Sequence, residues 1–291
     1  MWSNLRRVLT SAWPHHAIAS FTLTTAATVA LCAGCSSPAP RQPLTATAIG
    51  QWIWTRADLA RFTESQQADT AIQAGIYIGA VTCDERTHTL ISRSGLSVGV
   101  VSVPVVTAVI RFEDGLERCR AAAPPADFSR ALDSAVRVLR TRATGRRIAA
   151  IQLDYDAPQR ALAAWATNVR ALRAGALAGD SVWVTSILAH LREPGYGDLF
   201  RTVVSGHVLQ VFDTGEEATS DQVAQALRLA RRARMPFRMG FGAFERQTRR
   251  GPTNHRAWFG TLRAFAAVDG YRGVWVFPAG RRWISIFREH G

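Results

Sequence analysis

The sequence predicts a single closed (β/α)8 barrel of the TIM type, and three observations lead to this fold class. Strand-like runs rich in Val, Ile and Phe alternate along the chain with helical patterns, which is typical of parallel α/β sheets. Eight such strand-like runs occur. The part of the chain that contains them has about 240 residues, which is close to the usual length of one TIM barrel. The sequence therefore has the elements and the length of one barrel.

Each expected strand is a short apolar run that ends at turn residues or at the start of a helical pattern. The expected strands span residues 51–55, 75–81, 105–112, 147–158, 181–188, 207–212, 236–242 and 273–277. The fourth run is the most informative, because Gln152, Asp154 and Asp156 fall at every second position. Alternate residues of a strand share one face, so we expect these three side chains to point the same way.

The helical patterns between the strands carry apolar residues on one face. The expected helices span residues 57–67, 127–142, 159–174, 198–204, 220–233 and 254–268. Thr219 and Gln222 form the pattern of a capping box at the start of the 220–233 helix. Residues 82–103 lack a helical pattern, since 87–92 alternate and Ser94-Gly95 indicates a turn. We expect a β-hairpin there, with the second helix of the barrel missing or reduced.

The first 34 residues have the pattern of a secretory leader. Arg6 and Arg7 precede an uncharged stretch at 17–34, which ends in Ala-Gly directly before Cys35. This pattern resembles a bacterial lipoprotein leader, which implies that Cys35 is lipidated and that 35–47 is a flexible tether. It also implies an anchor at the outer membrane, facing the periplasm. An ordinary cleaved leader with free secretion is the alternative, and the barrel domain would span 48–291 in both cases.

Cys83 and Cys119 are the thiols that remain outside the leader and the lipidation site. In an oxidising compartment they can form a disulfide, although two buried free cysteines would give the same pattern.

The chain has a formal net charge of +13, and all 35 of its basic residues are arginines. A basic surface is a feature of nucleic-acid-binding proteins, but these arginines are scattered and form no stripe with interleaved aromatic residues. We therefore expect no nucleic-acid partner. The charge favours, at most, contact with anionic lipid headgroups or acidic glycans.

Several strand motifs together resemble one bacterial family. These motifs are Trp52-Ile53-Trp54, Val109-Ile110-Arg111-Phe112, Gln152-Leu153-Asp154-Tyr155-Asp156-Ala157, Thr185-Ser186-Ile187-Leu188 and Phe237-Arg238-Met239-Gly240. They are similar to those of the family of domains of unknown function numbered 3142, over nearly the whole chain after the leader. The resemblance implies a barrel related to the TIM-barrel glycoside hydrolases, and it implies no particular activity.

The carboxyl ends of the strands form the mouth of a TIM barrel, where catalytic residues lie. Strand alternation places charged and aromatic side chains at this mouth. The expected substrate-binding residues are Trp54, Arg56, Arg111, Gln210, Arg238 and Trp275. Tryptophans stack on the apolar faces of sugar rings and charged groups hydrogen-bond to sugar hydroxyls, so this set favours a saccharide.

Glycoside hydrolysis needs a protonated acid and, in most cases, a second carboxylate. We expect Asp156 to be the acid, because it lies nearest the strand end, with Asp154 beneath it as its partner. Glu113 and Glu245 are candidates for the second carboxylate, and Asp213 is a further one.

Other interpretations of the sequence compete with this one. The two aspartates have a purely structural role if they form ion pairs with Arg111 and Arg238. A carboxylate and imidazole metal site could include His190 or His207, but no histidine pair has the spacing of metal ligands. The glycines near residue 240 do not precede a helix closely enough for a dinucleotide loop. We expect neither a metal nor an organic cofactor.

The sequence therefore predicts an envelope-anchored, glycoside-hydrolase-like barrel that acts on or binds a polysaccharide. The alternative is a non-catalytic barrel that binds a glycan or an envelope partner at the same mouth.

Overall fold

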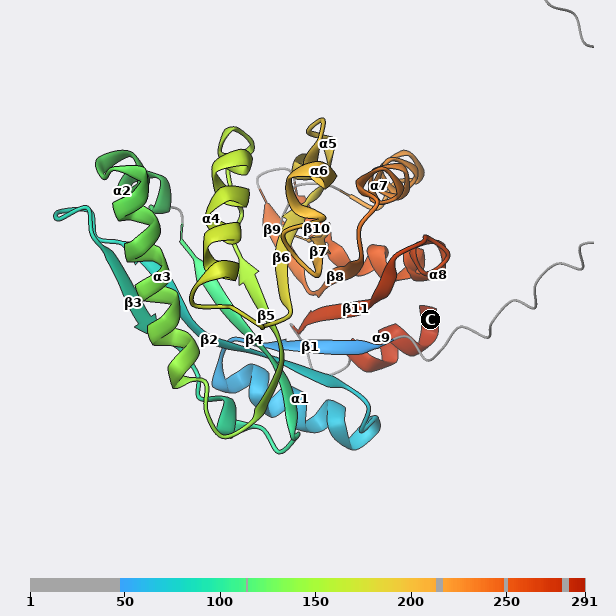
Figure 1. The fold of residues 1–291 in the computed structure, drawn as a ribbon. Helices are drawn as coiled ribbons and strands as arrows, with labels where there is room; N and C mark the ends of the chain where they lie inside the picture. The colour runs from blue at the N-terminus through green and yellow to red at the C-terminus, as the bar shows by residue number, and fades with distance from the viewer. Residues whose placement is uncertain (1–47, 114, 213–216, 249–250, 279–282, 291) are drawn as a thin grey trace, which may run out of the picture. The chain divides into compact units, whose positions relative to one another are not determined.

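The computed structural model describes residues 48–113, 115–212, 217–248, 251–278 and 283–290. Within these ranges eight parallel strands close into a barrel (Figure 1), which confirms the predicted TIM-like α/β fold. In order around the ring, the strands are β1 (Ile49–Ile53), β2 (Gln73–Cys83), β4 (Val105–Phe112), β5 (Arg147–Asp154), β6 (Val182–Ile187), β7 (Gly206–Gln210), β8 (Phe237–Ala243) and β11 (Tyr271–Pro278). β11 pairs with β1 and closes the ring. The predicted leader and tether, with Cys35, lie outside the described residues.

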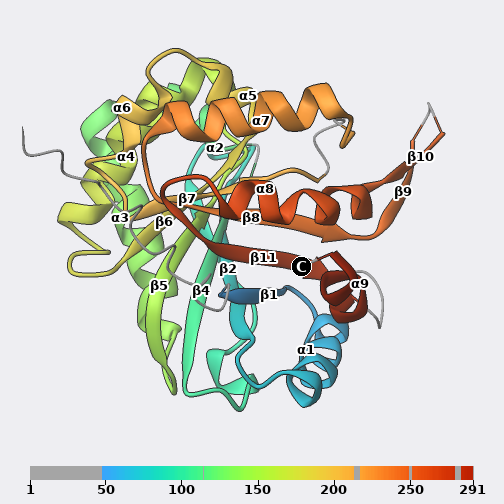
Figure 2. The same ribbon diagram turned by 90° about the vertical axis from the view of Figure 1, so that its right-hand side faces the viewer.

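Helices surround the barrel on its outer side (Figure 2). The longer ones are α1 (Arg56–Ala68), α3 (Pro125–Arg142), α4 (Leu162–Ala174) and α7 (Ser220–Ala233). The shorter ones are α2 (Leu116–Ala122), α5 (Leu188–Arg192), α6 (Tyr196–Phe200), α8 (Leu262–Ala266) and α9 (Trp283–His290). None of the described helices is long and apolar enough to cross a membrane.

Capping residues set the starts of two of these helices. α1 begins at a capping box that the sequence analysis did not predict, in which the side chain of Thr55 accepts from the Asp58 N–H and Asp58 accepts from the Thr55 N–H. α7 spans the predicted residues, and Thr219 caps it by accepting from the Gln222 N–H at 3.3 Å. The helix predicted over 254–268 is instead a 3-10 helix (His255–Thr261) followed by α8.

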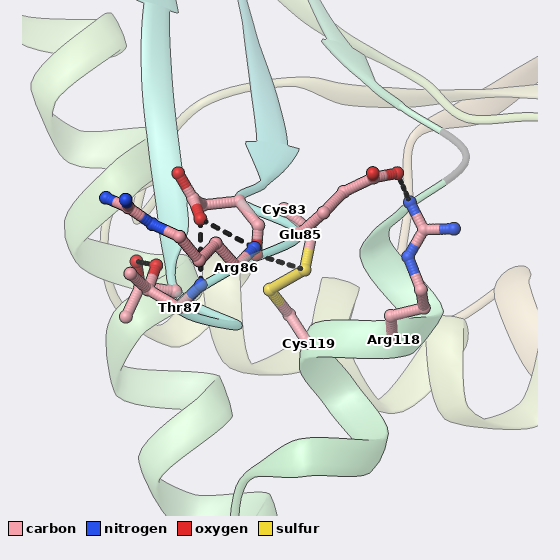
Figure 3. Close-up of a disulfide and its surroundings, with 8 residues drawn as sticks. Cys83, Glu85, Arg86, Thr87, Arg118 and Cys119 are labelled. Atoms are coloured by element: carbon pink, nitrogen blue, oxygen red, sulfur yellow. Dashed lines mark hydrogen bonds and ion pairs between the residues drawn. A yellow bond between two sulfur atoms is a disulfide. The ribbon is translucent and has the colours of Figure 1, made fainter.

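The predicted hairpin occurs after β2. β3 (Leu90–Ser94) pairs antiparallel with β2 outside the ring, and only a 3-10 turn (Val98–Val100) lies between β3 and β4. Cys83, at the end of β2, forms a disulfide with Cys119 in α2 (Figure 3), which is the pairing that the sequence analysis considered. A second hairpin, β9 (Glu245–Thr248) with β10 (Gly251–Asn254), was not predicted.

The apolar side chains form two separate cores. One lies between the barrel and its helices, as in all barrels of this type. The other fills the inside of the barrel, where Trp52, Trp183 and Trp275 are buried together with Val109 and Val208. The inside is therefore packed with side chains up to the mouth.

Candidate active site at the barrel mouth

A chain of side-chain hydrogen bonds runs up the inner face of β5 and ends at the mouth. The Trp52 indole N–H donates to Gln152 (3.0 Å), and the Gln152 amide donates to Thr185 (3.0 Å). The Thr185 hydroxyl donates to Asp154 Oδ1 at 2.7 Å. Gln152 and Asp154 therefore share the inner face, as strand alternation predicts. The chain fixes Asp154 at the top of the packed interior.

Arg111, at the end of β4, holds both aspartates. Its guanidinium donates to Asp154 Oδ2 at 2.8 Å and to Asp156 Oδ2 at 3.1 Å. The side chain of Asp154 is 6% exposed, whereas that of Asp156 is 35% exposed. The Oδ1 atom of Asp156 is buried and has no hydrogen-bond partner among the described residues. By the exposed fraction of its side chain, Asp156 is the member of the pair that solvent or a ligand can reach.

The charges of this cluster do not balance, because one guanidinium faces two carboxylates. Burial raises the pKa of Asp154 above its ordinary value, although Arg111 acts in the opposite direction. Burial alone would lower the pKa of Arg111, but the two aspartates raise it above the usual range. The cluster therefore keeps Arg111 charged, and burial favours the protonated form of Asp154.

Aromatic side chains lie at the mouth, where Tyr77 is within electrostatic range of Arg111. The rings of Trp54 and Tyr77 stack with their centroids 4.8 Å apart and an interplanar angle of 8°. The ring centroid of Phe277 lies 6.2 Å from that of Trp54, and the ring centroid of Phe212 lies 5.8 Å from that of Phe277. Burial, followed by the nearby charge of Glu113, raises the pKa of Tyr77. Sequence analysis missed Tyr77, although it alternates with Gly75 on β2, and missed Phe277, which follows Trp275 at the strand-like spacing of two.

Glu113, a predicted candidate for the second carboxylate, lies close to Arg111. It follows β4 and lines a cavity of about 410 Å³ together with Arg111 and Arg93. Glu85 and Arg118 form an ion pair on the same cavity wall, next to the disulfide (Figure 3). The wall of the cavity therefore comes from the end of β4, from the β2–β3 hairpin and from the start of α2.

The structure does not describe the side chains of the other predicted carboxylates. The backbone of Glu245 begins β9, and its side chain lies outside the described part of the chain, as does Asp213.

The other predicted substrate-binding residues do not all lie at the mouth. Gln210 donates to the Phe212 carbonyl at 3.1 Å near the mouth. Arg56 is exposed at the start of α1. Trp275 is only 1% exposed, which corrects its expected place at the mouth, because it fills the barrel interior above Gly50 and Gly75.

Arg238 is also not at the mouth. It is the second residue of β8, near the amino ends of the barrel strands, and its guanidinium lies 4.0 Å from the centre of the Trp183 ring. Burial lowers the pKa of Arg238 to about 10. The expected pairing of an aspartate with Arg238 is therefore wrong, and among the described residues it is Arg111 that bridges both aspartates.

The two histidines considered as metal ligands lie on the outer side of the barrel wall. His190 hydrogen-bonds to the Ala157 carbonyl at 2.7 Å, and His207 to the Ser186 hydroxyl at 2.6 Å. Within the described ranges no three His, Cys, Asp or Glu side chains gather as metal ligands would.

Comparisons with known proteins support the fold class. No protein-family model and no curated protein matches the sequence, so the resemblance to family 3142 stays a prediction. Three solved structures are similar in fold. The spore cortex-lytic enzyme SleL of Bacillus cereus has a TM-score of 0.54 and 10% identity, over 83% of this chain and 73% of that chain. A chitinase from Rhizomucor miehei has a TM-score of 0.53 and 9% identity, over 84% and 98%.

The third structure is concanavalin B, with a TM-score of 0.53 and 12% identity over 85% of this chain and 100% of that chain. These neighbours are glycoside-hydrolase-like TIM barrels. The similarity at such low identity concerns the fold, and the site has to be argued from this chain's own residues.

Proposed function

We propose that the protein binds a polysaccharide at the mouth of its barrel and hydrolyses it with Asp156 as the general acid. The observation that carries this proposal is the Asp154–Arg111–Asp156 cluster, whose outer carboxylate is partly exposed. Its Arg111 is within electrostatic range of Tyr77, which stacks on Trp54. Aromatic faces beside carboxylates are a typical combination for sugar rings. Two structures with a similar fold are, by their names, a chitinase and a spore cortex-lytic enzyme.

The proposed chemistry assigns one role to each group. The carboxylate pair shares one guanidinium, so it can hold one proton, which Asp156 delivers to the glycosidic oxygen. Asp154 and Arg111 position Asp156 through their contacts. Glu113 is the candidate for the second carboxylate, which either attacks the sugar or activates water. Trp54 stacks on a sugar ring next to the cleaved bond.

The location of the protein is part of the proposal. The lipoprotein-like leader supports an anchor at Cys35 in the outer membrane, with the barrel facing the periplasm. An envelope or extracellular polysaccharide is then the class of substrate within reach.

A non-catalytic binding barrel is the second candidate function. One observation favours it: both aspartates are engaged by Arg111, as they would be in a structural ion-pair network. In that case the aromatic mouth binds a glycan and leaves it uncut.

Release of products by the purified protein tests the proposal and separates the two candidates. Peptidoglycan, chitin-like and exopolysaccharide substrates are incubated with wild type and Asp156→Asn, and new reducing ends are measured. We expect the variant to lose cleavage by a factor of about 100 or more, because the acid can no longer donate a proton. Asp127→Asn is the matched control, since Asp127 pairs with Arg130 on the exposed start of α3.

The same substrates are then used to measure binding. Glycan binding without cleavage, equal in wild type and Asp156→Asn but lost in Trp54→Ala, would establish the non-catalytic barrel. Cleavage that is equal in wild type and Asp156→Asn would rule out Asp156 as the acid.

A further inference from the structure

A basic cavity lies in the outer helical layer, away from the mouth. It has a volume of about 760 Å³ and is formed by residues 191–201, which include α6, and by the carboxyl-terminal half of α7. α6 and α7 lie side by side in both views (Figures 1 and 2). The cationic side chains in its wall are Arg201, Arg228, Arg231, Arg232 and Arg234. Glu193 and Asp198 are the acidic ones, so three positive charges remain uncompensated in the wall.

The backbone brings these arginines together by a close approach of α6 to α7. A Cβ atom on Gly197 would lie 2.2 Å from the Ala233 carbonyl oxygen, so only glycine permits this approach. Gly195 precedes α6 with φ of +80°, which also favours glycine. Arg232 links α7 to the opposite wall of the cavity, because its guanidinium donates to the backbone carbonyls of Leu191 and Arg192. The cavity is therefore held by packing and by hydrogen bonds.

The arginines are more numerous than the helix ends require. Basic residues in the last turn of a helix interact favourably with its free carbonyl groups, which accounts for Arg231 and Arg232. That effect does not extend to Arg228, which lies before the last turn of α7. Arg201, on the opposite wall, is the C-cap of α6 and pairs with Asp198. Arg228, Arg231 and Arg234 form no ion pair with any described residue. Their charges are free for a ligand.

Arg234 also occupies an uncommon backbone position. It ends α7 in the left-handed conformation, with φ of +50°, where glycine or asparagine is usual. A side chain at this position costs about 1 kcal/mol relative to glycine. Arg234 adds a further cation to the cavity wall. Such strained positions are often found at ligand sites.

We propose that this cavity binds the phosphate groups of an anionic ligand. Guanidinium groups reach the cavity from two walls, and a tetrahedral phosphate can accept hydrogen bonds from several directions, whereas a planar carboxylate offers two oxygens. A phosphate monoester carries a charge near −2 at neutral pH, which compensates most of the excess positive charge of the cavity wall. The phosphate can belong to a lipid headgroup or to a soluble phosphorylated molecule.

Calorimetric titration with inorganic pyrophosphate tests the proposal, and citrate serves as the carboxylate comparison. The full chain carries Cys35→Ser, so that no acyl chain contributes to membrane binding. The cavity variant is Arg228→Gln/Arg231→Gln/Arg234→Gln. The control is Arg147→Gln/Arg160→Gln/Arg170→Gln, which removes the same charge from exposed positions elsewhere. We expect the cavity variant to bind pyrophosphate at least about tenfold more weakly and the control to bind it like wild type.

Vesicles of phosphatidylcholine with and without phosphatidic acid identify the source of the phosphate. Binding to phosphatidic acid that pyrophosphate displaces indicates a lipid headgroup, whereas binding of pyrophosphate alone indicates a soluble ligand. The proposal is overturned if wild type binds neither probe, if citrate binds as tightly as pyrophosphate, or if both triple variants lose the same affinity. Near-ultraviolet circular dichroism verifies that both variants keep the wild-type fold.

Discussion

Arg111 shows how much of the site depends on single residues. Its guanidinium contacts a buried carboxylate on one side and a partly exposed one on the other. A buried charge that loses its partner is strongly destabilising, while an exposed one is not. The residue therefore has a structural role toward Asp154 and a positioning role toward Asp156.

Replacement of Arg111 by glutamine should destabilise the protein by about 3–5 kcal/mol at pH 7, because Asp154 is then buried either ionised without a cation or with a proton that it has to take up from solvent. Burial raises the pKa of Asp154, so its protonated form stabilises the fold at low pH and this contribution is lost as the pH rises through the raised pKa. The deficit should thus be smaller at about pH 4, as urea denaturation can measure. Arg137→Gln, which breaks an exposed pair, should change the stability by less than about 1 kcal/mol. A deficit that does not vary with pH would contradict this account.

The buried position of His207 leads to a second prediction about how the stability of the protein depends on pH. Burial, and then the nearby His190, lowers the pKa of His207 to about 3, whereas the unfolded chain takes up a proton near pH 6.5. The stability should therefore fall as the pH falls from about 6.5 toward 3, by up to about 1.4 kcal/mol per pH unit from this residue. The free energy of unfolding of His207→Gln should vary less steeply with pH in this range. An equally steep slope in wild type and His207→Gln would refute the prediction.

At the scale of elements, a large residue on one barrel strand packs against a small residue on another strand inside the barrel. Tryptophans on β1, β6 and β11 fill the interior, and glycines on neighbouring strands provide the space. This complementarity is a tertiary property, since each glycine faces a tryptophan from a different strand.

Gly75→Ala tests this packing. A Cβ atom at Gly75 would lie 2.3 Å from the Trp275 ring, so overpacking should cost about 1–3 kcal/mol of unfolding free energy, measured with urea. Gly260→Ala is the control, because no atom lies within 4 Å of the added Cβ. The packing argument fails if both variants have the stability of wild type.

At the scale of the whole molecule, the chain forms its barrel within one compact unit that begins at Leu44. A chain that starts at Leu44 should therefore unfold in one cooperative transition at the same midpoint temperature as the longer protein, within about 2 °C. Calorimetry of the two chains measures this. A markedly lower midpoint for the shorter chain would show that the preceding residues contribute to the fold.

The sequence by itself determined the eight barrel strands, their order and the inward face of the fourth of them. Alternation and helical periodicity are local properties, which is why β4 and α7 have the predicted bounds and why Gln152 and Asp154 share a face. The hairpin after β2 was predictable for the same reason, because its turn and alternation lie within a few residues of one another.

Only the tertiary structure decided which side chains meet. The stagger of the strands around the closed ring sets the height of each residue, and it places Arg238 near the amino ends of the strands and Trp275 in the packed interior. The same stagger stacks Tyr77 on Trp54 and lets Arg111 bridge both aspartates. The basic cavity likewise needs α6 to approach α7 at Gly197. Each of these contacts joins residues far apart in the chain, and strand parity defines the face of a side chain but not its height in the barrel.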